Sequence, residues 1–456
     1  MSVKNNSKNK ISLFEKIAYG GGDLASNLIL VLSSTFIVFF YTDALGLNAA
    51  IIGMIMLFSR LFDGISDILM GFVVDKTNSK YGKARPWLLW LAGPISVALV
   101  LMFMVPNFGD LGKYIYVAIT YNLVTTFLYT AINIPYGTLT SLMSRDQDQR
   151  MIINVFRMLM AQIGALVINA MTLPLVNSFG GSADQKSWII VSVMYAILAF
   201  VLFMLCFAKT KERVSISSNE QKNRLSFFAT LKICLKNDQW LVLVGFWVVM
   251  AFGLTMSMTV GTYYAKYILG NENFSGFLMA VSTIPVIVCM PLLPFFIRKI
   301  GKCKVAIIGG FISTAAYSMM LLNPISINWL LFCSIIKGIG MAASTGTIFA
   351  MIADTIEYGH WKTGIRVEGM LYSSTTFGAK VGAGVGGAIA LSILGSVGYD
   401  GLLAVQPASV LETLPIIYLY IPIVFSLAMP LLLIAFYKLD KIYPQVIEDL
   451  NKQEEA

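Results

Sequence analysis

Apolar stretches of about twenty residues recur along the whole chain, separated by short polar segments. An α-helix needs about 20 apolar residues to cross about 30 Å of hydrocarbon. Strands of a membrane barrel would instead alternate apolar and polar residues over about ten positions, and these stretches do not alternate. The pattern predicts an all-α integral membrane protein with twelve transmembrane helices, at 17–41, 49–74, 87–105, 113–141, 151–176, 187–208, 238–266, 274–298, 304–322, 327–356, 366–395 and 413–437.

The composition fits a lipid environment. Only 12% of the residues are charged and 57% are hydrophobic, whereas soluble domains carry roughly 25% charged residues. The mean hydropathy is +0.75. The five cysteines show neither a CxxC pair nor metal-ligand spacing, which predicts free thiols and no metal site. No apolar core with a small-residue cleavage site follows the basic amino terminus, so we expect no removable leader.

The 33 lysines and arginines predict the orientation, because cytoplasmic segments carry the excess of positive charge. With the amino terminus inside, most of them fall in cytoplasmic segments, and only Lys113, Lys186 and Lys266 fall outside. We therefore expect a multi-pass plasma-membrane protein with both termini cytoplasmic. Anionic lipid accounts for the net charge of +9, so no nucleic-acid partner is expected.

A segment rich in Lys, Asn and Ser lies near the middle of the chain and predicts a linker between two halves. The predicted organisation is an N-terminal six-helix half (1–208), a cytoplasmic linker (209–237) and a C-terminal six-helix half with a short cytoplasmic tail (238–456). Short basic glycine turns at 82–85 and 301–304 occupy equivalent places in the two halves. Two related six-helix halves around a midplane site are typical of the major facilitator type.

Acidic side chains inside the second span are candidates for function, because ionisable groups are costly within a bilayer. Arg60, Asp63 and Asp67 are spaced i, i+3 and i+7 and share one helix face, with Ser66 beside them. Two carboxylates one turn apart can ligate a hard cation or share a proton. A structural ion pair with Arg60 is the alternative, but it would need only one of the two acids.

Two basic residues inside spans are further candidates. Lys380 lies about 21 Å along its helix from Arg366, too far to reach the cytoplasmic surface, so it must face protein or a wet cavity. It could also be a buried partner of the two acids. Arg157 is only about 10 Å from Arg150, so snorkelling to the surface is an alternative to a role in binding.

Polar stripes mark two helices of the first half. Asn122, Tyr129 and Asn133 form one stripe, and Asp23 and Asn27 begin another. Amide and hydroxyl groups both donate and accept hydrogen bonds, which suits the hydroxyls of a sugar. The same groups also serve as hydrogen-bonding contacts between helices.

Several strings resemble the glycoside-pentoside-hexuronide:cation symporter family. They are RLFDGISDILMG at 60–71, YGKARPW at 81–87, NIPYG at 133–137, ADTIEYG at 353–359 and TGIRVEG at 363–369. These strings span both halves, so the resemblance covers essentially the whole chain. It implies a secondary active transporter of the major facilitator fold that moves a sugar together with a cation by alternating access.

The resemblance and the polar stripes together predict three sets of residues. The cation-coupling set is Asp63, Asp67, Ser66, Thr130 and Lys380. The substrate-binding set is Asn27, Asp23, Tyr129, Asn133, Arg157 and Lys380. The set of charges at a cytoplasmic gate is Asp354, Glu357, Arg366 and Glu368.

Departures from the family pattern narrow the expected substrate and ion. Asn27 and Asn133 stand where a galactoside carrier of the family has carboxylates, which favours a pentoside or hexuronide glycoside over an α-galactoside. Ser66 replaces an Asn whose carbonyl would help complete a Na⁺ shell, which favours H⁺, with Na⁺ coupling as the alternative. We expect no cofactor beyond the coupling ion, and a monomer.

Other classes of function fit the chain less well. An intramembrane enzyme would need catalytic motifs, but the chain has one histidine, His360, and neither HExxH, GxSxG nor a phosphate loop. A receptor without transport would bind ligand but show no uptake. A lipid carrier of related fold would be expected to have an apolar cavity, whereas Asn27, Asn133 and Lys380 are polar.

Overall fold

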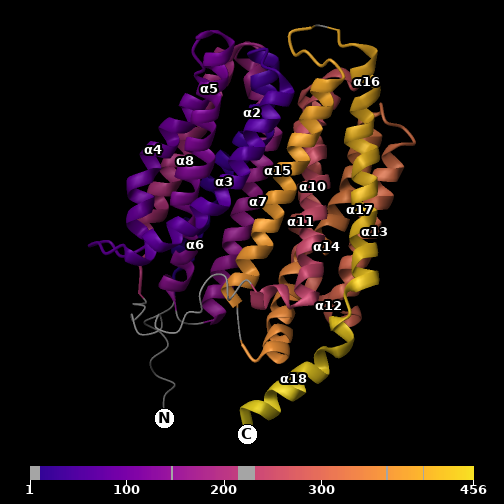
Figure 1. Ribbon diagram of the computed structural model, residues 1–456. Helices are drawn as coiled ribbons and strands as arrows, with labels where there is room; N and C mark the ends of the chain where they lie inside the picture. Colours follow the sequence, from indigo (N-terminus) through magenta and orange to yellow (C-terminus); the bar gives the residue numbers. More distant parts are fainter. Residues whose placement is uncertain (1–10, 145–146, 214–231, 366–367, 404, 456) are drawn as a thin grey trace. The chain divides into compact units, whose positions relative to one another are not determined.

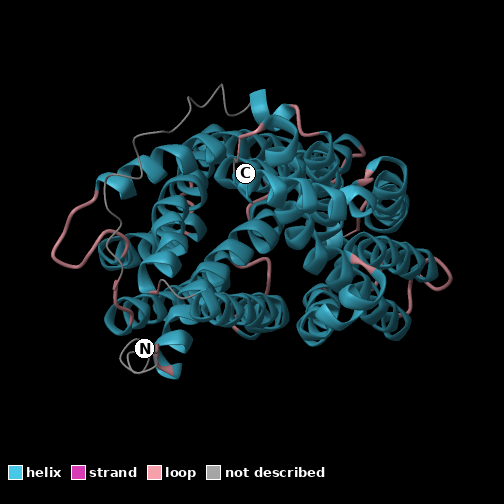
Figure 2. Ribbon diagram, turned by 90° about the horizontal axis from the view of Figure 1, so that it is seen from below, coloured by secondary structure: helices cyan, strands magenta, loops and turns pink. Residues whose placement is uncertain are grey.

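The computed structural model describes residues 11–144, 147–213, 232–365, 368–403 and 405–455 (Figure 1). Figure 2 draws these residues as helices and loops, with no strand among them. Their internal contacts divide the chain into two compact units. Unit 1 comprises Met1–Ser218 and Tyr399–Gln406, and unit 2 comprises Asn219–Gly398 and Pro407–Ala456.

Unit 1 consists of long apolar helices, two of which contain π-helical turns. The first consists of α1 (Leu13–Val31), η1 (Leu32–Phe36), α2 (Ile37–Phe39) and η2 (Phe40–Ala44). The next two are α3 (Ala49–Lys76) and α4 (Arg85–Phe103). A fourth consists of α5 (Gly109–Asn122), the π-helical η3 (Leu123–Leu128) and α6 (Tyr129–Met143). The last two are α7 (Gln147–Ser178) and α8 (Gln185–Lys209).

Unit 2 has the same general construction. Its first helices are α10 (Asp238–Tyr267), α11 (Asn273–Cys289), η5 (Met290–Leu292), α12 (Leu293–Ile300) and α13 (Lys302–Met320). The two long helices α14 (Ile327–Thr363) and α15 (Glu368–Ser396) follow. The chain ends with α16 (Ala408–Pro415), η6 (Ile416–Tyr420), α17 (Ile421–Phe436) and α18 (Leu439–Glu455).

Eleven helices in the described residues are long and apolar enough to cross a bilayer. The remaining predicted span, 49–74, coincides with α3, whose apolar part is Ala49–Arg60. The prediction of an all-α membrane protein is therefore confirmed. Eleven of the twelve predicted spans coincide with helices that are long and apolar enough to cross a bilayer. The largest difference at a helix end is in α14, which continues to Thr363 rather than ending at residue 356.

Glycines allow several helices to pack backbone to backbone. In unit 1, a side chain at Gly20 would lie 3.0 Å from the carbonyl oxygen of Phe156 on α7. In unit 2, Gly382 and Gly386 of α15 lie against the backbone of Val248 and Phe252 on α10. Such close contacts stabilise membrane helices, because apolar side chains gain little by leaving lipid for protein.

A distant carboxylate completes the start of α4 in unit 1. Ala84 precedes this helix and has no side chain that could bond the free N–H groups. The Glu212 carboxylate accepts hydrogen bonds from the N–H groups of Lys83, Ala84 and Arg85 at 2.9, 2.9 and 3.0 Å. Gly82, with a φ of 108°, provides the space, because a Cβ there would collide with Glu212. Glu212 therefore acts as the N-cap of α4.

Unit 2 repeats this arrangement at α13. Gly301, with a φ of 91°, precedes the helix and has no side chain to cap it. Asp440, just beyond the last span, accepts a hydrogen bond from the N–H of Cys303 at 3.2 Å. The two glycine turns recognised in the sequence therefore share a feature: the helix after each turn is capped by a carboxylate from the segment that follows the last span of its half. The approach of the carboxylate is too close for a Cβ at Gly82, whereas a Cβ at Gly301 would make an ordinary contact at 3.6 Å.

The helix α18 lies where the sequence predicts only a short tail. Its buried residues Val446 and Leu450 belong to an apolar cluster with residues of α10, α14 and α17. Trp361 Nε1 donates a hydrogen bond to Asp449 at 3.1 Å. Burial raises the pKa of Tyr443 to about 12, so its hydroxyl keeps its proton and donates to Asp354. The tail prediction missed this docked helix, because its short charged pattern resembles a solvated terminus.

Replacing Glu212 by Ala should destabilise unit 1, because three N–H groups at the start of α4 lose their acceptor. The expected cost is about 0.5–2 kcal/mol, the range for loss of an N-cap. Thermal unfolding of the purified protein in detergent measures it. Glu212→Gln keeps a carbonyl acceptor and should cost less. A Glu212→Ala protein as stable as the wild type would contradict this role.

Candidate functional site

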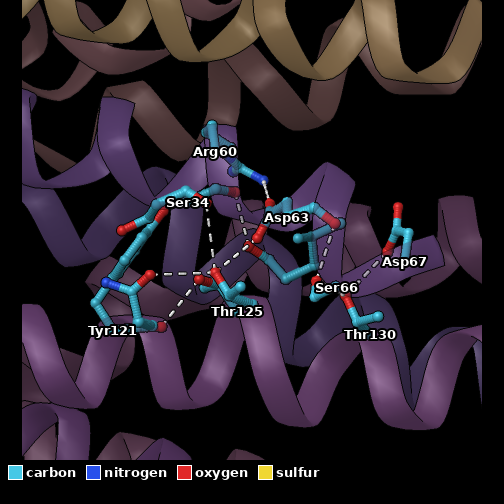
Figure 3. A network of polar contacts seen from close by, with 12 residues as sticks. Ser34, Arg60, Asp63, Ser66, Asp67, Tyr121, Thr125 and Thr130 are labelled. Atoms are coloured by element: carbon cyan, nitrogen blue, oxygen red, sulfur yellow. Dashed lines mark hydrogen bonds and ion pairs between the residues drawn. The ribbon is translucent and has the colours of Figure 1, made fainter. Parts of the chain in front are cut away.

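Carboxylate and hydroxyl groups meet in unit 1 between α3 and the segment formed by η3 and α6. Asp63 is 3% exposed, and its Oδ1 accepts a hydrogen bond from Thr126 Oγ1 at 2.6 Å. The Arg60 guanidinium lies 3.4 Å from the other oxygen, Oδ2 (Figure 3). The ion pair considered from the sequence is therefore present, and it engages Asp63.

Asp67 lies one turn further along α3 and has its own hydroxyl partner. Thr130 Oγ1 donates to Asp67 Oδ1 at 3.0 Å (Figure 3). Ser66 Oγ donates to the backbone carbonyl of Asp63 at 2.9 Å and lies 3.4 Å from Thr130 Oγ1. The structure thus places Asp63, Ser66, Asp67 and Thr130 in one cluster. We call these four residues, with Arg60 and Thr126, the acid cluster.

The π-helical turn η3 contributes to this arrangement. Thr126 lies within it, and Thr130 follows four residues later on α6, so each hydroxyl faces one of the two acids. π-Helical turns within α-helices occur frequently at functional sites. Oxygen atoms from two carboxylates and several hydroxyls can hold a hard cation, or a proton on one acid.

A second group of polar side chains joins α1, α6 and α7. Arg157 Nε donates to Asp23 Oδ2 at 3.0 Å, with side-chain exposures of 29% and 13%. The Arg157 guanidinium also lies over the ring of Tyr136, 5.2 Å from its centre. A Cβ at Gly137 would lie 3.9 Å from the guanidinium, so this glycine leaves space beside it. Arg157 therefore points into the protein rather than snorkelling to the surface.

Two tyrosines connect α1 to α6 next to Arg157. The Tyr19 hydroxyl donates to the carbonyl of Tyr136 at 3.0 Å, and the Tyr136 hydroxyl donates to the carbonyl of Tyr19 at 2.7 Å. Their rings stack with centres 4.7 Å apart. Asp23 lies one turn beyond Tyr19 on α1, so the Asp23–Arg157 pair lies next to this contact.

The predicted asparagines differ in their contacts. Asn27 Nδ2 donates to the backbone carbonyl of Asp23 at 2.9 Å, so part of its amide is used within its own helix. Asn133 Oδ1 is buried and accepts no hydrogen bond from the described residues. A buried oxygen without a donor costs free energy, so an explanation is needed, and a ligand hydroxyl would provide one.

Tyr129 links the two groups of charges. It lies close enough to interact electrostatically with Asp23 and Arg157, and also with Arg60 and Asp67. Tyr129 is adjacent in sequence to Thr130, which bonds Asp67. The first turn of α6 therefore contacts the acid cluster through Thr130, and Tyr129 lies within electrostatic range of the Asp23–Arg157 pair.

Lys380 and the predicted gate charges belong to unit 2. Lys380 is partly buried on α15. Asp354 is buried and bonds Lys302 Nζ at 2.6 and 2.7 Å. Glu357 is partly buried on α14, while Arg366 and the side chain of Glu368 lie outside the described residues. The gate and the role of Lys380 therefore stay predictions.

Comparison with known proteins identifies the family. The sequence matches the family described as MFS/sugar transport protein over residues 18–441. The chain belongs to this family. The predicted transporter of sugar-carrier type is confirmed, and the protein is a multi-pass membrane transporter rather than an enzyme.

Curated relatives of this family align along nearly the whole chain. The uncharacterized symporter YnaJ of Bacillus subtilis is 34% identical, over 98% of this chain and 96% of its own length. The isoprimeverose transporter of Lactiplantibacillus pentosus is 31% identical, over 98% and 93%. The putative glycoside/cation symporter YagG of Escherichia coli is 29% identical, over 98% and 97%. The resemblance to cation symporters read from the motifs is therefore confirmed.

Solved structures support the fold. A bacterial homologue of the human lysosomal transporter Spinster aligns with a TM-score of 0.63 and 14% identity, covering 96% of both chains. At this identity the likeness concerns the fold alone. It confirms the predicted major facilitator fold for this member of the sugar transport family.

The structure adds residues to the site that sequence analysis did not select. Thr126 bonds Asp63, and Tyr136 supports Arg157. A signal for Thr126 was available, because it lies four residues before Thr130 and would share its helix face. Tyr136 gave no separate signal, since an aromatic residue in an apolar helix is usually a packing residue.

Replacing Arg157 by Lys in this sugar transporter should reduce transport about tenfold or more. Lysine keeps the charge but loses the planar group that bonds Asp23 while stacking on Tyr136, and a site of that kind does not tolerate the exchange. Initial uptake rates in membrane vesicles, normalised to the amount of folded protein, measure the effect. Uptake by Arg157→Lys at the wild-type rate would show that the planar group is not required.

Proposed function

We propose that this sugar transporter is a proton-coupled symporter that takes up a pentoside or hexuronide glycoside by alternating access. The observation that carries the proposal is the acid cluster, in which two carboxylates one turn apart each accept a hydroxyl hydrogen bond. The putative glycoside/cation symporter YagG among the relatives supports coupling to a cation. The isoprimeverose transporter supports a glycoside as substrate.

The charges of the acid cluster explain why cation and substrate move together. The cluster contains two acids and one arginine, so a bound monovalent cation would bring its formal charge to zero. Moving an uncompensated charge through an apolar environment is costly, so the unloaded carrier resists reorientation with substrate bound. Sequence alone supports Lys380 as the charge that compensates the acids in the empty carrier.

The contacts of the two acids favour a proton as the coupling ion. Each oxygen of Asp63 already has a partner, Thr126 on one and Arg60 on the other. Ser66 uses its hydroxyl hydrogen within its own helix. A proton needs only one accepting oxygen on one of the two acids. Na⁺ is the second candidate, because Thr130 Oγ1 lies 3.0 Å from Asp67 Oδ1 and 3.4 Å from Ser66 Oγ.

The proposed substrate site contains the Asp23–Arg157 pair with Asn27, Tyr129 and Asn133. Arg157 uses Nε for Asp23, so its two terminal nitrogens remain to bond sugar hydroxyls or a uronate carboxylate. Asn133 Oδ1 can accept from a sugar hydroxyl. Gly137 leaves room beside the guanidinium for the ring. We further propose a monomer in the plasma membrane, with both termini cytoplasmic, as the distribution of Lys and Arg supports.

Asp67→Asn should abolish accumulation of substrate against its gradient, because an amide cannot take up a proton at neutral pH. Exchange of labelled for unlabelled substrate should survive. Proteoliposomes with an imposed pH gradient provide both measurements, with the wild type as the positive control. If accumulation by the wild type required Na⁺ and did not respond to the pH gradient, H⁺ would not be the coupling ion. If Asp67→Asn still accumulated substrate, Asp67 would not be the coupling residue.

Xylosides or glucuronides should compete with transport far better than α-galactosides. Asn27 and Asn133 offer neutral hydrogen-bond partners. A hydrogen bond to a charged group is worth about 1.5–3 kcal/mol, whereas one between neutral groups is worth about 1 kcal/mol. The test measures inhibition of one labelled substrate by a xyloside, a glucuronide and melibiose. Strong competition by melibiose alone would show that the two asparagines do not exclude galactosides.

A further inference from the structure

A short segment between α15 and α16 packs with unit 1. Tyr399–Gln406 belongs to unit 1 by its contacts, although α15 before it and α16 after it belong to unit 2. It docks on η2, at the end of the first helix of unit 1, and on the residues that follow η2. The chain therefore passes from unit 2 to unit 1 and back within this one segment.

A buried carboxylate holds the segment on unit 1. Asp43 of η2 is 4% exposed, and its Oδ2 accepts a hydrogen bond from the Tyr399 hydroxyl at 2.6 Å. The ring of Tyr399 is itself buried. Thr42 Oγ1 donates to the same carboxylate oxygen at 2.9 Å. Hydrogen bonds to an ionised acceptor are roughly twice as strong as those between neutral groups, so this contact fixes where the segment docks.

Two glycines bring the backbones together beside this hydrogen bond. A Cβ at Gly401 would collide with the backbone carbonyl oxygen of Thr42. Likewise, a Cβ at Gly46, just after η2, would lie 2.7 Å from Cδ1 of Leu402. The segment and the end of the first helix therefore fit closely at positions where any residue larger than glycine would interfere with docking.

The segment is folded rather than slack. Gln406 is 4% exposed, and its Nε2 donates to the carbonyl groups of Asp400 and Leu403 at 2.6 and 3.2 Å. Its Oε1 accepts from the N–H of Asp400 at 3.3 Å. Gly398, with a φ of 86°, turns the chain directly before Tyr399. A movement of α15 relative to unit 1 is therefore transmitted to Tyr399, because no loose chain lies between them to absorb it.

We propose that Asp43, Tyr399 and Gly401 form a latch that holds the carrier closed toward the outside and releases when the substrate site opens there. The inference rests on the alternating access of the proposed function. With the amino terminus cytoplasmic, the first helix begins inside, so η2 lies at its outer end. Opening at this end moves the two halves of the chain apart. The hydrogen bond from Tyr399 to Asp43 is the contact that breaks.

The first test measures how often the site opens to the outside. The reporter is Asn27→Cys, at a half-buried position on α1, in a Cys289→Ser background, because Cys289 is the native thiol that is not buried. Whole cells are treated with the impermeant reagent 2-(trimethylammonium)ethyl methanethiosulfonate. Tyr399→Phe keeps the ring and removes the hydroxyl, so the reporter should react about tenfold faster as the population shifts toward the open state.

The second test prevents docking through the backbone. Gly401→Ala places a methyl group against the carbonyl of Thr42 and should also make the reporter react about tenfold faster. Gly93→Ala on α4 is the matched control, because a Cβ there meets no atom within 4 Å, and it should leave the rate unchanged. A purely structural role of the segment would lower thermal stability without changing the rate of modification.

The outcomes separate the latch from the transported substrate, because the rate of modification is measured without sugar and without an ion gradient. If Tyr399→Phe and Gly401→Ala both react at the wild-type rate, the latch is wrong, whatever the wild type transports. If both react faster while the wild type accumulates no pentoside or hexuronide, the latch stands and the proposed substrate is wrong.

Discussion

Lipid offers no hydrogen-bond partners, so every polar group within the span must be satisfied by the protein itself. This constraint makes the backbone helical and determines where the charged side chains lie. Asp63 is surrounded by Thr126 and Arg60, and Asp23 is paired with Arg157. Asp63 connects α3 to η3 through Thr126, and Asp23 connects α1 to α7 through Arg157. The polar clusters are therefore both the functional candidates and the contacts that hold unit 1 together.

The helix α6 contributes to both polar groups of unit 1. Its first residues carry Thr130, which bonds Asp67, while Tyr136 supports Arg157 one and a half turns later. The buried oxygen of Asn133 lies between them. A displacement of α6 would alter both groups, because each has a direct contact to this one rigid element. Because α6 contacts both the proposed cation site and the proposed sugar site, a movement of this one helix could couple the binding of the two.

The sequence was sufficient for the helical class, the family and every member of the acid cluster except Thr126. Intramembrane acids at helical spacing have few explanations, so Asp63 and Asp67 could be selected from their positions alone. The threonine partner of Asp63 was missed because hydroxyls are common on membrane helices and carry little information singly. The docked helix α18 was missed because its burial depends on α10, α14 and α17, which are distant in sequence. Contacts of that kind follow from packing and cannot be read from local patterns.

The carboxylate caps have a consequence for biosynthesis. The first turn of α4 is made early, but its acceptor, Glu212, emerges from the ribosome only after 127 or more further residues. A similar delay, of 137 residues, separates Cys303 from Asp440. Until then the exposed N–H groups must be solvated by water at the membrane surface. The cap of each half therefore forms only after its last span has been synthesised. A chain truncated just before either carboxylate would insert its helices, but one of them would lack its N-terminal cap.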